Sequence, residues 1–199
     1  MKLFIATLVL VLITGTKLSG QPFNYNQNIK TFQANYVGTH EVVKGKDRKY
    51  FRFFPVDSAY RIRAIFEKIV DTTGFTMKTS GAITKQYYRY GKLSFSLRDT
   101  LLQLFLYQSK DLMKTDAYKN YLFIPFTDIT SGDESYGSGR YLDFTIGDIA
   151  NNGLVIDFNK AYNPYCAYAS GFHCPLPPKE NFLKINIIAG EKVFGKKSH

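Results

Sequence analysis

The side chains that are most capable of chemical reactions lie in residues 157–178, DFNKAYNPYCAYASGFHCPLPP. This segment holds both cysteines of the chain, Cys166 and Cys174, and places His173 beside the second one. Three interpretations are open: a disulfide, a metal site that includes His173, or a cysteine nucleophile that the histidine activates. The C-x2-C spacing of structural zinc sites is missing, and neighbouring histidine and cysteine side chains rarely bind one ion, so we predict no metal site.

A second group of reactive side chains is formed by Glu134, Arg140 and Asp157. Arg140 could hold a carboxylate or phosphate of a ligand through two parallel hydrogen bonds. It could equally form a buried structural pair with Asp143, Asp157 or Glu134. Glu134 and Asp157 would suit glycoside hydrolysis if their carboxylates stood ~5–10 Å apart across a cleft. The sequence does not fix that separation, so ligand binding without catalysis and hydrolysis both stay open.

The N-terminus has the features of a secretory signal. Lys2 is followed by the apolar run Leu3–Ile13 and then by small and polar residues. The run is shorter than the ~20 residues that span a bilayer, so we predict a signal peptide over residues 1–20 that is cleaved before Gln21. A retained N-terminal anchor is the alternative. We therefore expect a periplasmic or secreted protein with no transmembrane helix in its mature chain. In an oxidising compartment two cysteines most often form a disulfide, with two packed thiols as the alternative.

Composition narrows the classes of partner. The formal net charge of the 199 residues is +10, but the basic residues are dispersed rather than gathered in a dense run. Because we also expect export, we predict no nucleic-acid partner. The motifs G-x-S-x-G, H-E-x-x-H and the P-loop are absent from the sequence, and we predict no cofactor. A small polar ligand, a glycan or an anionic envelope surface is the expected partner. The sequence predicts no particular oligomeric state.

Short strands must position these residues. In residues 92–97, KLSFSL, the side chains of Leu93, Phe95 and Leu97 share one face, which is typical of a half-buried strand. Thr100–Tyr107 fits either a buried strand or two helical turns, and Phe32–Val43 fits a helix or a strand. We predict an all-β fold, a mainly antiparallel sandwich or barrel-like sheet with few short helices, over residues 50–199 after a polar segment at 21–49. Further strands are expected at 50–54, 60–66, 75–79, 85–90, 121–126, 140–146, 154–158 and 182–188, with turn signals between them, including Gly91.

Three blocks of the second half resemble a known family. They are TSGDESYGSGRYLDF (130–144), DFNKAYNPYCAY (157–168) and CPLPPKENFLKINIIAGEK (174–192). Together with RFFPVDSAYRIRAIF and YLFIPFTDIT upstream, they are similar in order and spacing to the prokaryotic domain-of-unknown-function family 1684, over roughly residues 50–194. The resemblance implies no activity. It implies that the shared polar residues form one ligand site or one structural corner, and the candidates are Glu134, Tyr136, Arg140, Asp143, Asp157, Asn159, Asn163 and Asn181.

The same segments also have a structural interpretation. Pro164 and the prolines of residues 175–178 fix the backbone and remove strand donors, which predicts a stiff loop. Asparagine side chains commonly hydrogen-bond to backbone groups in such irregular segments. From these observations we predict an exported domain that binds a small polar ligand, glycan or envelope partner. The alternative is a hydrolase of envelope or extracellular glycans or esters that uses paired carboxylates.

Overall fold

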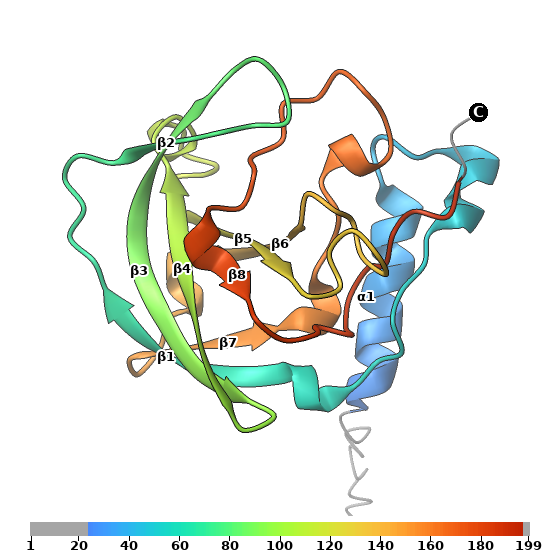
Figure 1. Cartoon of the computed structure of the whole chain (residues 1–199), viewed down its shortest axis with the longest axis horizontal. Coiled ribbons are helices and arrows are strands. Elements are labelled where there is room, and N and C mark those ends of the chain that lie inside the picture. Colours follow the sequence, from blue (N-terminus) through green and yellow to red (C-terminus); the bar gives the residue numbers. More distant parts are fainter. Residues whose placement is uncertain (1–23, 197–199) are drawn as a thin grey trace, which may run out of the picture.

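Antiparallel strands dominate the computed structural model, which describes residues 24–196; the predicted signal peptide lies outside these residues. The strands form one curled sheet that closes about half of a barrel (Figure 1). This arrangement confirms the predicted all-β, barrel-like and mainly antiparallel class. The strands are β1 (Arg61–Lys68), β2 (Phe75–Met77), β3 (Lys85–Leu97), β4 (Thr100–Ser109), β5 (Tyr121–Asp128), β6 (Arg140–Thr145), β7 (Gly153–Asp157) and β8 (Phe182–Leu183).

Most strands that are neighbours in the sheet are also consecutive in the sequence. The strand order runs β6-β5-β4-β3-β1-β7, with β2 paired to β3 and β8 paired in parallel to β5. The predicted strand at 182–188 is therefore reduced to the two residues of β8. The predicted strand at 50–54 is wrong as well, because this segment makes one isolated bridge, between Phe53 and Glu191. Residues 50–54 contact the C-terminal segment instead, for example through the hydrogen bond from the Lys192 amide to the Arg52 carbonyl at 2.9 Å. Residues 184–188 make single contacts, such as the hydrogen bond from the Ile129 amide to the Ile185 carbonyl at 3.1 Å. Neither segment has the repeated hydrogen bonds of a strand ladder.

The β3–β4 hairpin is the longest element of the sheet. The two strands pair from Tyr87 to Leu97, so the predicted strands at 85–90 and 92–97 are one strand. Gly91 marks a shift of register inside β3 instead of the expected turn. A Cβ atom at this position would collide with the ring of Phe66 on β1, which explains why glycine suits the bulge. The hairpin turns through Arg98 and Asp99, whose φ angles of 49° and 60° are those of a two-residue turn.

Alternation along the strands divides the side chains between two faces. The inner face carries the main core, and residues of β5 and β6 supply part of it. The outer face carries a smaller aromatic cluster, and one of its residues, Tyr141, lines the candidate site described in the next section. The main core includes Tyr60, Leu93, Phe95, Leu104, Leu122, Ile124, Phe126, Leu142, Ile156 and Phe158, and the aromatic cluster consists of Met77, Tyr87, Tyr107, Phe123 and Tyr141.

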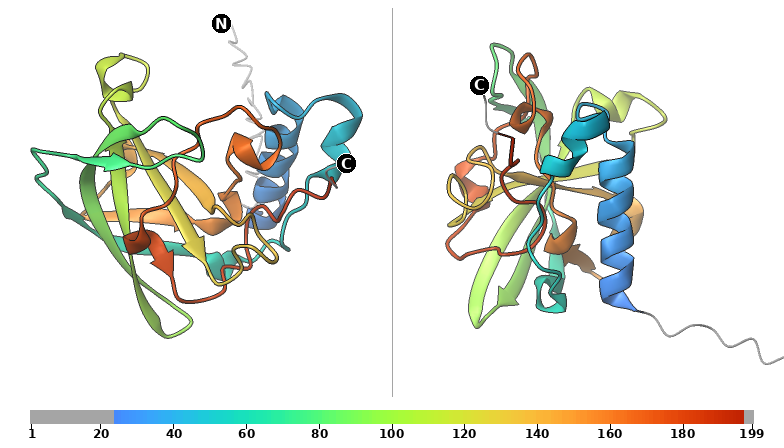
Figure 2. Two further views of the ribbon diagram at one scale, coloured as in Figure 1. Left: turned by 45° about the horizontal axis from the view of Figure 1, so that its top comes forward. Right: turned by 90° about the vertical axis from the view of Figure 1, so that its right-hand side faces the viewer.

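Helix α1 (Tyr25–Thr39) stands beside the sheet, on the rear side of the molecule in the view of Figure 1 (Figure 2). The side chain of Asn24 caps the helix by accepting a hydrogen bond from the Gln27 amide at 3.1 Å. Ile29 is its one buried residue, so the helix has no broad apolar stripe. Tyrosines attach it instead, among them Tyr25, whose hydroxyl donates to Asp157 Oδ1 at 2.9 Å. The segment 21–49, predicted as polar and weakly patterned, thus contributes a helix that packs on the sheet.

Short 3-10 helices lie between the strands, and none of them is long enough to form a layer. In the part of the chain that the structure describes, no helix is both long and apolar enough to cross a bilayer. The 3-10 helices are Gly45–Tyr50, Ser58–Tyr60, Leu112–Lys114, Ile146–Asp148, Phe158–Lys160, Tyr165–Ala167 and Lys179–Asn181.

Candidate functional site

Arg140, the first residue of β6, is a structural link. Its side chain is fully buried, and one guanidinium nitrogen donates to Asp128 Oδ2 at 2.8 Å and to the Ile187 carbonyl at 2.9 Å. The other nitrogen donates to the carbonyls of Ala189 and Glu191. Arg140 thereby ties the C-terminal segment to β5 and β6. Its partner is not one of the three carboxylates considered from the sequence. The donors of both terminal nitrogens are used internally and the Nε is buried, so Arg140 has no free pair of donors for a ligand.

Asn181 replaces a missing part of the sheet ladder. Strands β4 and β5 are paired through one residue pair, Tyr107 and Phe123, and they separate beyond it. In this gap the Asn181 amide donates to the carbonyls of Phe105 and Pro125 at 2.9 and 2.8 Å, and its oxygen accepts from the Phe105 amide at 2.7 Å. The side chain is fully buried. Asn181 therefore satisfies backbone groups that would otherwise be orphaned, and it is not free to bind a ligand.

Asn159 and Asn163 also bind backbone groups. Asn159 accepts from the Asp57 amide at 3.0 Å and donates to the Asp57 carbonyl at 2.8 Å, which fixes the chain before β1. Asn163 donates to the Lys192 carbonyl at 2.8 Å. Both side chains are almost completely buried. These contacts agree with the structural interpretation of the asparagines.

Glu134 and Tyr136 lie apart from the other candidates, in the loop between β5 and β6. Glu134 is exposed and forms an ion pair with Lys192 at 3.1 Å. The Tyr136 carbonyl accepts a hydrogen bond from Gly139 at 2.9 Å, and its side chain is half-buried. Gly139 takes a φ of 89°, which allows the loop to turn tightly into β6. Neither Glu134 nor Tyr136 lines the cavities described next.

Asp143 is the candidate that lines both of the cavities described below. It lies opposite Phe123 on the outer face of β6 and is exposed to solvent. Tyr121 donates to its Oδ1 at 2.7 Å, and Tyr162 donates to both oxygens at 2.8 and 2.9 Å. The surrounding walls partly desolvate the carboxylate and raise its pKa, while the two tyrosine hydrogen bonds oppose that rise. Two hydroxyls hold the carboxylate in place and leave acceptor capacity on Oδ2 for a ligand.

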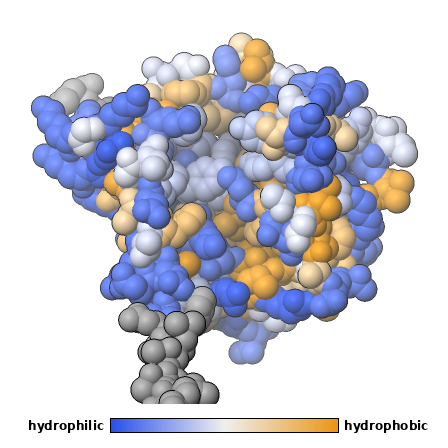
Figure 3. Space-filling model, turned by 180° about the vertical axis from the view of Figure 1, so that it is seen from behind, coloured by the Kyte–Doolittle hydropathy of each residue, from blue (hydrophilic) through white to orange (hydrophobic). Residues whose placement is uncertain are grey.

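The cavity above Asp143 is large and walled by aromatic rings. We call it the aromatic cavity; its volume is about 830 Å³. The surface seen from behind is hollowed near its middle (Figure 3), on the side of the molecule where α1 lies. Ring centroids 5.9 Å apart connect Tyr141 to Tyr162 and Tyr162 to Tyr36, so the outer aromatic cluster continues onto α1. The aromatic residues of its walls are Phe32, Tyr36, Tyr141, Tyr162, Tyr165 and Phe172.

A second cavity adjoins the first and has more charged walls. This charged cavity has a volume of about 510 Å³, and it shares Phe32, Asp143 and Tyr162 with the aromatic cavity. Asp157 lines it, but its Oδ1 already accepts from the Tyr25 hydroxyl at 2.9 Å and from the Asn159 backbone amide at 3.1 Å. The charged residues of its walls are Arg61, Asp143, Asp148, Asp157 and Lys160.

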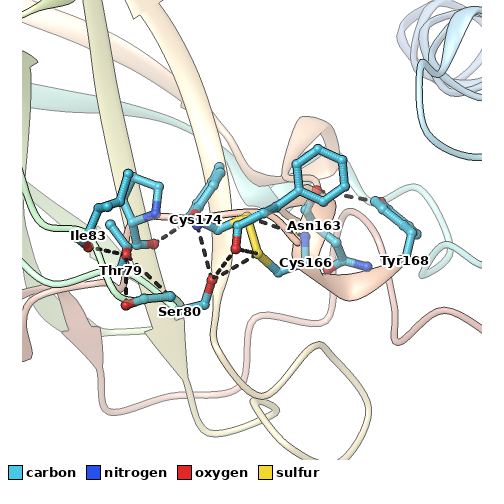
Figure 4. The surroundings of a disulfide bond; sticks show 11 residues. Thr79, Ser80, Ile83, Asn163, Cys166, Tyr168 and Cys174 are labelled. Carbon is cyan, nitrogen blue, oxygen red and sulfur yellow. Dashed lines mark hydrogen bonds between the residues drawn. A yellow bond between two sulfur atoms is a disulfide. The ribbon is translucent and has the colours of Figure 1, made fainter. Parts of the chain in front are cut away.

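The cysteines form a disulfide whose loop borders the aromatic cavity. Cys166 and Cys174 are bonded, with 6.3 Å between their Cα atoms. Ser80 joins this loop to the connection between β2 and β3: its hydroxyl accepts from the Cys174 amide at 3.1 Å, and its amide donates to the Cys174 carbonyl at 2.9 Å (Figure 4). His173 and Cys174 line the cavity. Among the described residues, no three His, Cys, Asp or Glu side chains are grouped so that they could hold a metal ion.

Glu191 anchors the C-terminal part of α1 through Tyr36. Its carboxylate is fully buried and accepts from the Tyr168 hydroxyl at 2.8 Å, from Tyr36 of α1 at 3.3 Å and from the Asn163 amide at 2.9 Å. Burial raises the pKa of Glu191 to about 7, although these hydrogen bonds lower it. His40 packs edge-on against the Tyr168 ring, with 4.6 Å between ring centroids, and burial lowers the pKa of its imidazole. This cluster positions two residues of the cavity wall, Tyr36 and His40.

The fold and the cavities define a β half-barrel protein with a ligand-sized, aromatic hollow between a helix and the edge strand β6. The chain belongs to the family described as "Protein of unknown function (DUF1684)", whose model matches residues 48–192, and this confirms the resemblance seen in the sequence. An uncharacterized protein of Haloarcula marismortui, solved by solution NMR, has 29% sequence identity to the chain and a TM-score of 0.62. That match covers 83% of this chain and 94% of the other. A comparison with curated proteins gives no match.

The structure thus divides the eight candidates. Asp143 and Asp157 line cavities, whereas the others hold the backbone, pair with other side chains or lie apart from the cavities. Sequence reasoning did not single out Tyr121, Tyr36 and Phe32 as site residues. Strand alternation would have placed Tyr121 on the face opposite the core. No signal in the sequence would have brought the helix residues Phe32 and Tyr36 to β6.

Proposed function

We propose that the protein is an exported domain that binds a small, partly apolar ligand in the aromatic cavity. The observation that carries this proposal is the position of Asp143, an exposed carboxylate with two tyrosine donors that lies where the two cavities meet. Aromatic walls around a few fixed polar groups are the usual construction of a small-molecule site. The volume of about 830 Å³ lies within the range of such sites.

Export is supported by two independent features. The apolar run after Lys2 has the length of the apolar core of a signal peptide, and the Cys166–Cys174 disulfide suits an oxidising compartment. Expression of the full chain followed by mass determination of the product tests this part of the proposal. A mass that corresponds to cleavage before Gln21, together with two unreactive cysteines, is expected. A full-length product with two free thiols would contradict export.

Ligand-observed NMR of the purified protein with mixtures of small amines, alcohols, sugars and carboxylic acids tests the binding proposal. Compounds that bind to the native chain should bind at least about tenfold more weakly to Asp143→Asn or Tyr162→Phe, because each replacement disturbs the polar centre of the cavity. Glu134→Gln is the matched control, since it removes a carboxylate that lines neither cavity. The melting temperature of each variant separates lost binding from lost folding. Equal binding by all four proteins would refute the site.

Hydrolysis is the second candidate function, and one observation favours it. Asp143 and Asp157 line the same charged cavity, and partial desolvation by the surrounding walls raises the pKa of Asp143, which is the direction that favours a general acid. Glu134 and Asp157 are a less suitable catalytic pair, because Glu134 is paired with Lys192 and lines neither cavity. Chromogenic glycosides and esters test this candidate. Turnover that disappears in both Asp143→Asn and Asp157→Asn would favour a hydrolase over a binding protein.

A further inference from the structure

The chemistry of the walls where the two cavities meet indicates the class of ligand, and this inference rests on the proposed binding function. Phe32, Asp143 and Tyr162 are the residues common to both cavities. A carboxylate flanked by aromatic rings is the arrangement that binds organic cations, because both the negative charge and the negative ring faces attract them. We propose that this junction selects an organic cation: a protonated or quaternary amine attached to an apolar body.

Lys160 provides the first support, because its ammonium already acts as such a cation. Lys160 Nζ lies 5.3 Å from the centroid of the Phe32 ring, within the usual cation–π distance. The side chain is exposed, and among the ion pairs of the described residues none includes Lys160. The Phe32 face therefore holds a cation in the wall of the charged cavity. A ligand cation would take the place of this ammonium on the ring.

The second support comes from the polar groups around Asp143. Tyr121 and Tyr162 both donate to the carboxylate, so it does not need a further neutral donor to hold its position. It lacks a cationic partner, because no ion pair among the described residues includes Asp143. Its surroundings penalise the charged form, and a bound cation would relieve that penalty. A neutral ligand of the same shape would not.

The other residues in the wall of the aromatic cavity indicate which chemical groups suit the rest of the ligand. Glu41 accepts from the Tyr165 hydroxyl at 2.8 Å and adds a second negative group to the wall. Among the described residues that line this wall, Lys85 is the one lysine or arginine. Between these groups the wall consists largely of rings, which suits an aliphatic or aromatic body rather than a second charge. The volume of about 830 Å³ leaves room for a body of several carbon atoms beside the amine.

A pair of isosteric probes tests the inference. Choline and 3,3-dimethylbutan-1-ol have the same shape, but a quaternary carbon replaces the quaternary nitrogen in the alcohol. NMR titration of the purified chain should show choline binding at least about tenfold more tightly than the alcohol. Asp143→Asn should reduce this preference to less than about threefold. Lys160→Met should strengthen choline binding and leave alcohol binding unchanged, because it removes the competing ammonium from Phe32.

Two further probes test the apolar body of the ligand. They also distinguish failure of the cation inference from failure of the proposed binding function. Hexyltrimethylammonium should bind more tightly than choline, and hexanoate more weakly than hexyltrimethylammonium. Equal affinity for choline and the alcohol, or tighter binding of hexanoate, would overturn the cation inference while the cavity itself remains a binding site. If none of the four probes binds and an uncharged apolar dye does, the inference also fails but the proposed function stands. Failure of every probe and of the dye would refute both. Lys160 is exposed, so its variant tests the inference even if Asp143→Asn does not fold.

Discussion

Replacement of Glu191 by glutamine should remove a pH-dependent loss of stability. The Glu191 carboxylate is fully buried, and desolvation raises its pKa to about 7 from an ordinary value of 4.5. In the folded chain the group therefore holds a proton over a range of pH in which it has lost that proton in the unfolded chain. Glutamine has a similar shape and no charge to desolvate, so the variant keeps the hydrogen-bonded cluster without this titration.

The sign and size of the effect follow from proton linkage. Below pH 4.5 the group is protonated in both states and contributes no penalty. As the pH rises from 4.5 to 7, the folded state binds more protons than the unfolded state, so the free energy of unfolding decreases. Above pH 7 the full penalty is present. The difference between 4.5 and about 7 corresponds to about 3 kcal/mol.

Urea unfolding of the native chain and of Glu191→Gln at pH 4 and pH 8 measures this quantity. The free energy of unfolding of the variant, minus that of the native chain, should be about 3 kcal/mol larger at pH 8 than at pH 4. The change with pH matters here, because any constant effect of the amide cancels. His40 titrates with the opposite sign, since burial lowers its pKa, and Asp143 titrates with the same sign as Glu191. Both are present in the two proteins and cancel to first order.

A difference that changes by less than about 1 kcal/mol between the two pH values would refute the reasoning. It would mean that the hydrogen bonds from Tyr168, Tyr36 and the Asn163 amide compensate the desolvation of the carboxylate. The pKa of Glu191 can also be followed directly through the chemical shift of its carboxyl carbon. A titration midpoint below about 5 in that experiment would contradict the same premise from the folded state alone.

Three further replacements test the structural roles assigned to candidate residues, each by urea unfolding. Arg140→Leu should lower the free energy of unfolding by about 3–5 kcal/mol, because it leaves the buried Asp128 carboxylate without its cationic partner; a loss below about 1 kcal/mol would contradict the link. Asn181→Ala should lower the free energy of unfolding by about 3 kcal/mol, because backbone groups of β4 and β5 lose their hydrogen-bond partners. The control Lys184→Ala, at an exposed residue, should change it by less than about 0.5 kcal/mol. Similar losses in both variants would disprove the structural role of Asn181. Cys174→Ser should cost about 2–3 kcal/mol, and a reducing agent should have the same effect on the native chain but none on the variant.

The fold class followed from the sequence because alternation is a local property. Leu93, Phe95 and Leu97 share a face in the sequence pattern, and the structure buries all three. Gly91 was misinterpreted for a local reason too: glycine marks turns and bulges alike, and the distinction depends on the Phe66 ring of the neighbouring strand. The two-residue extent of β8 likewise depends on which strand lies beside it.

The site was less accessible to sequence reasoning, because long-range contacts create it. The polar blocks pointed to Asp143, which lines both cavities, but they pointed equally to Arg140 and Asn181, whose types suit a ligand site and a structural corner alike. Only the hydrogen-bond partners of each side chain in the folded chain distinguish a ligand site from a structural corner. The walls contributed by α1 had no signal at all, since the helix docks through tyrosine hydroxyls and rings instead of an apolar stripe.

The position of α1 also has a consequence for how the cavity can be changed. The family model begins at residue 48, whereas the helix ends at Thr39, so the wall residues Phe32 and Tyr36 lie before the matched region. The floor residue Asp143 lies within it. The cavity is therefore lined by residues from inside and from outside the region that the family model matches. Replacement of residues 24–43 would therefore change the cavity walls at Phe32 and Tyr36 without altering any residue of the β strands.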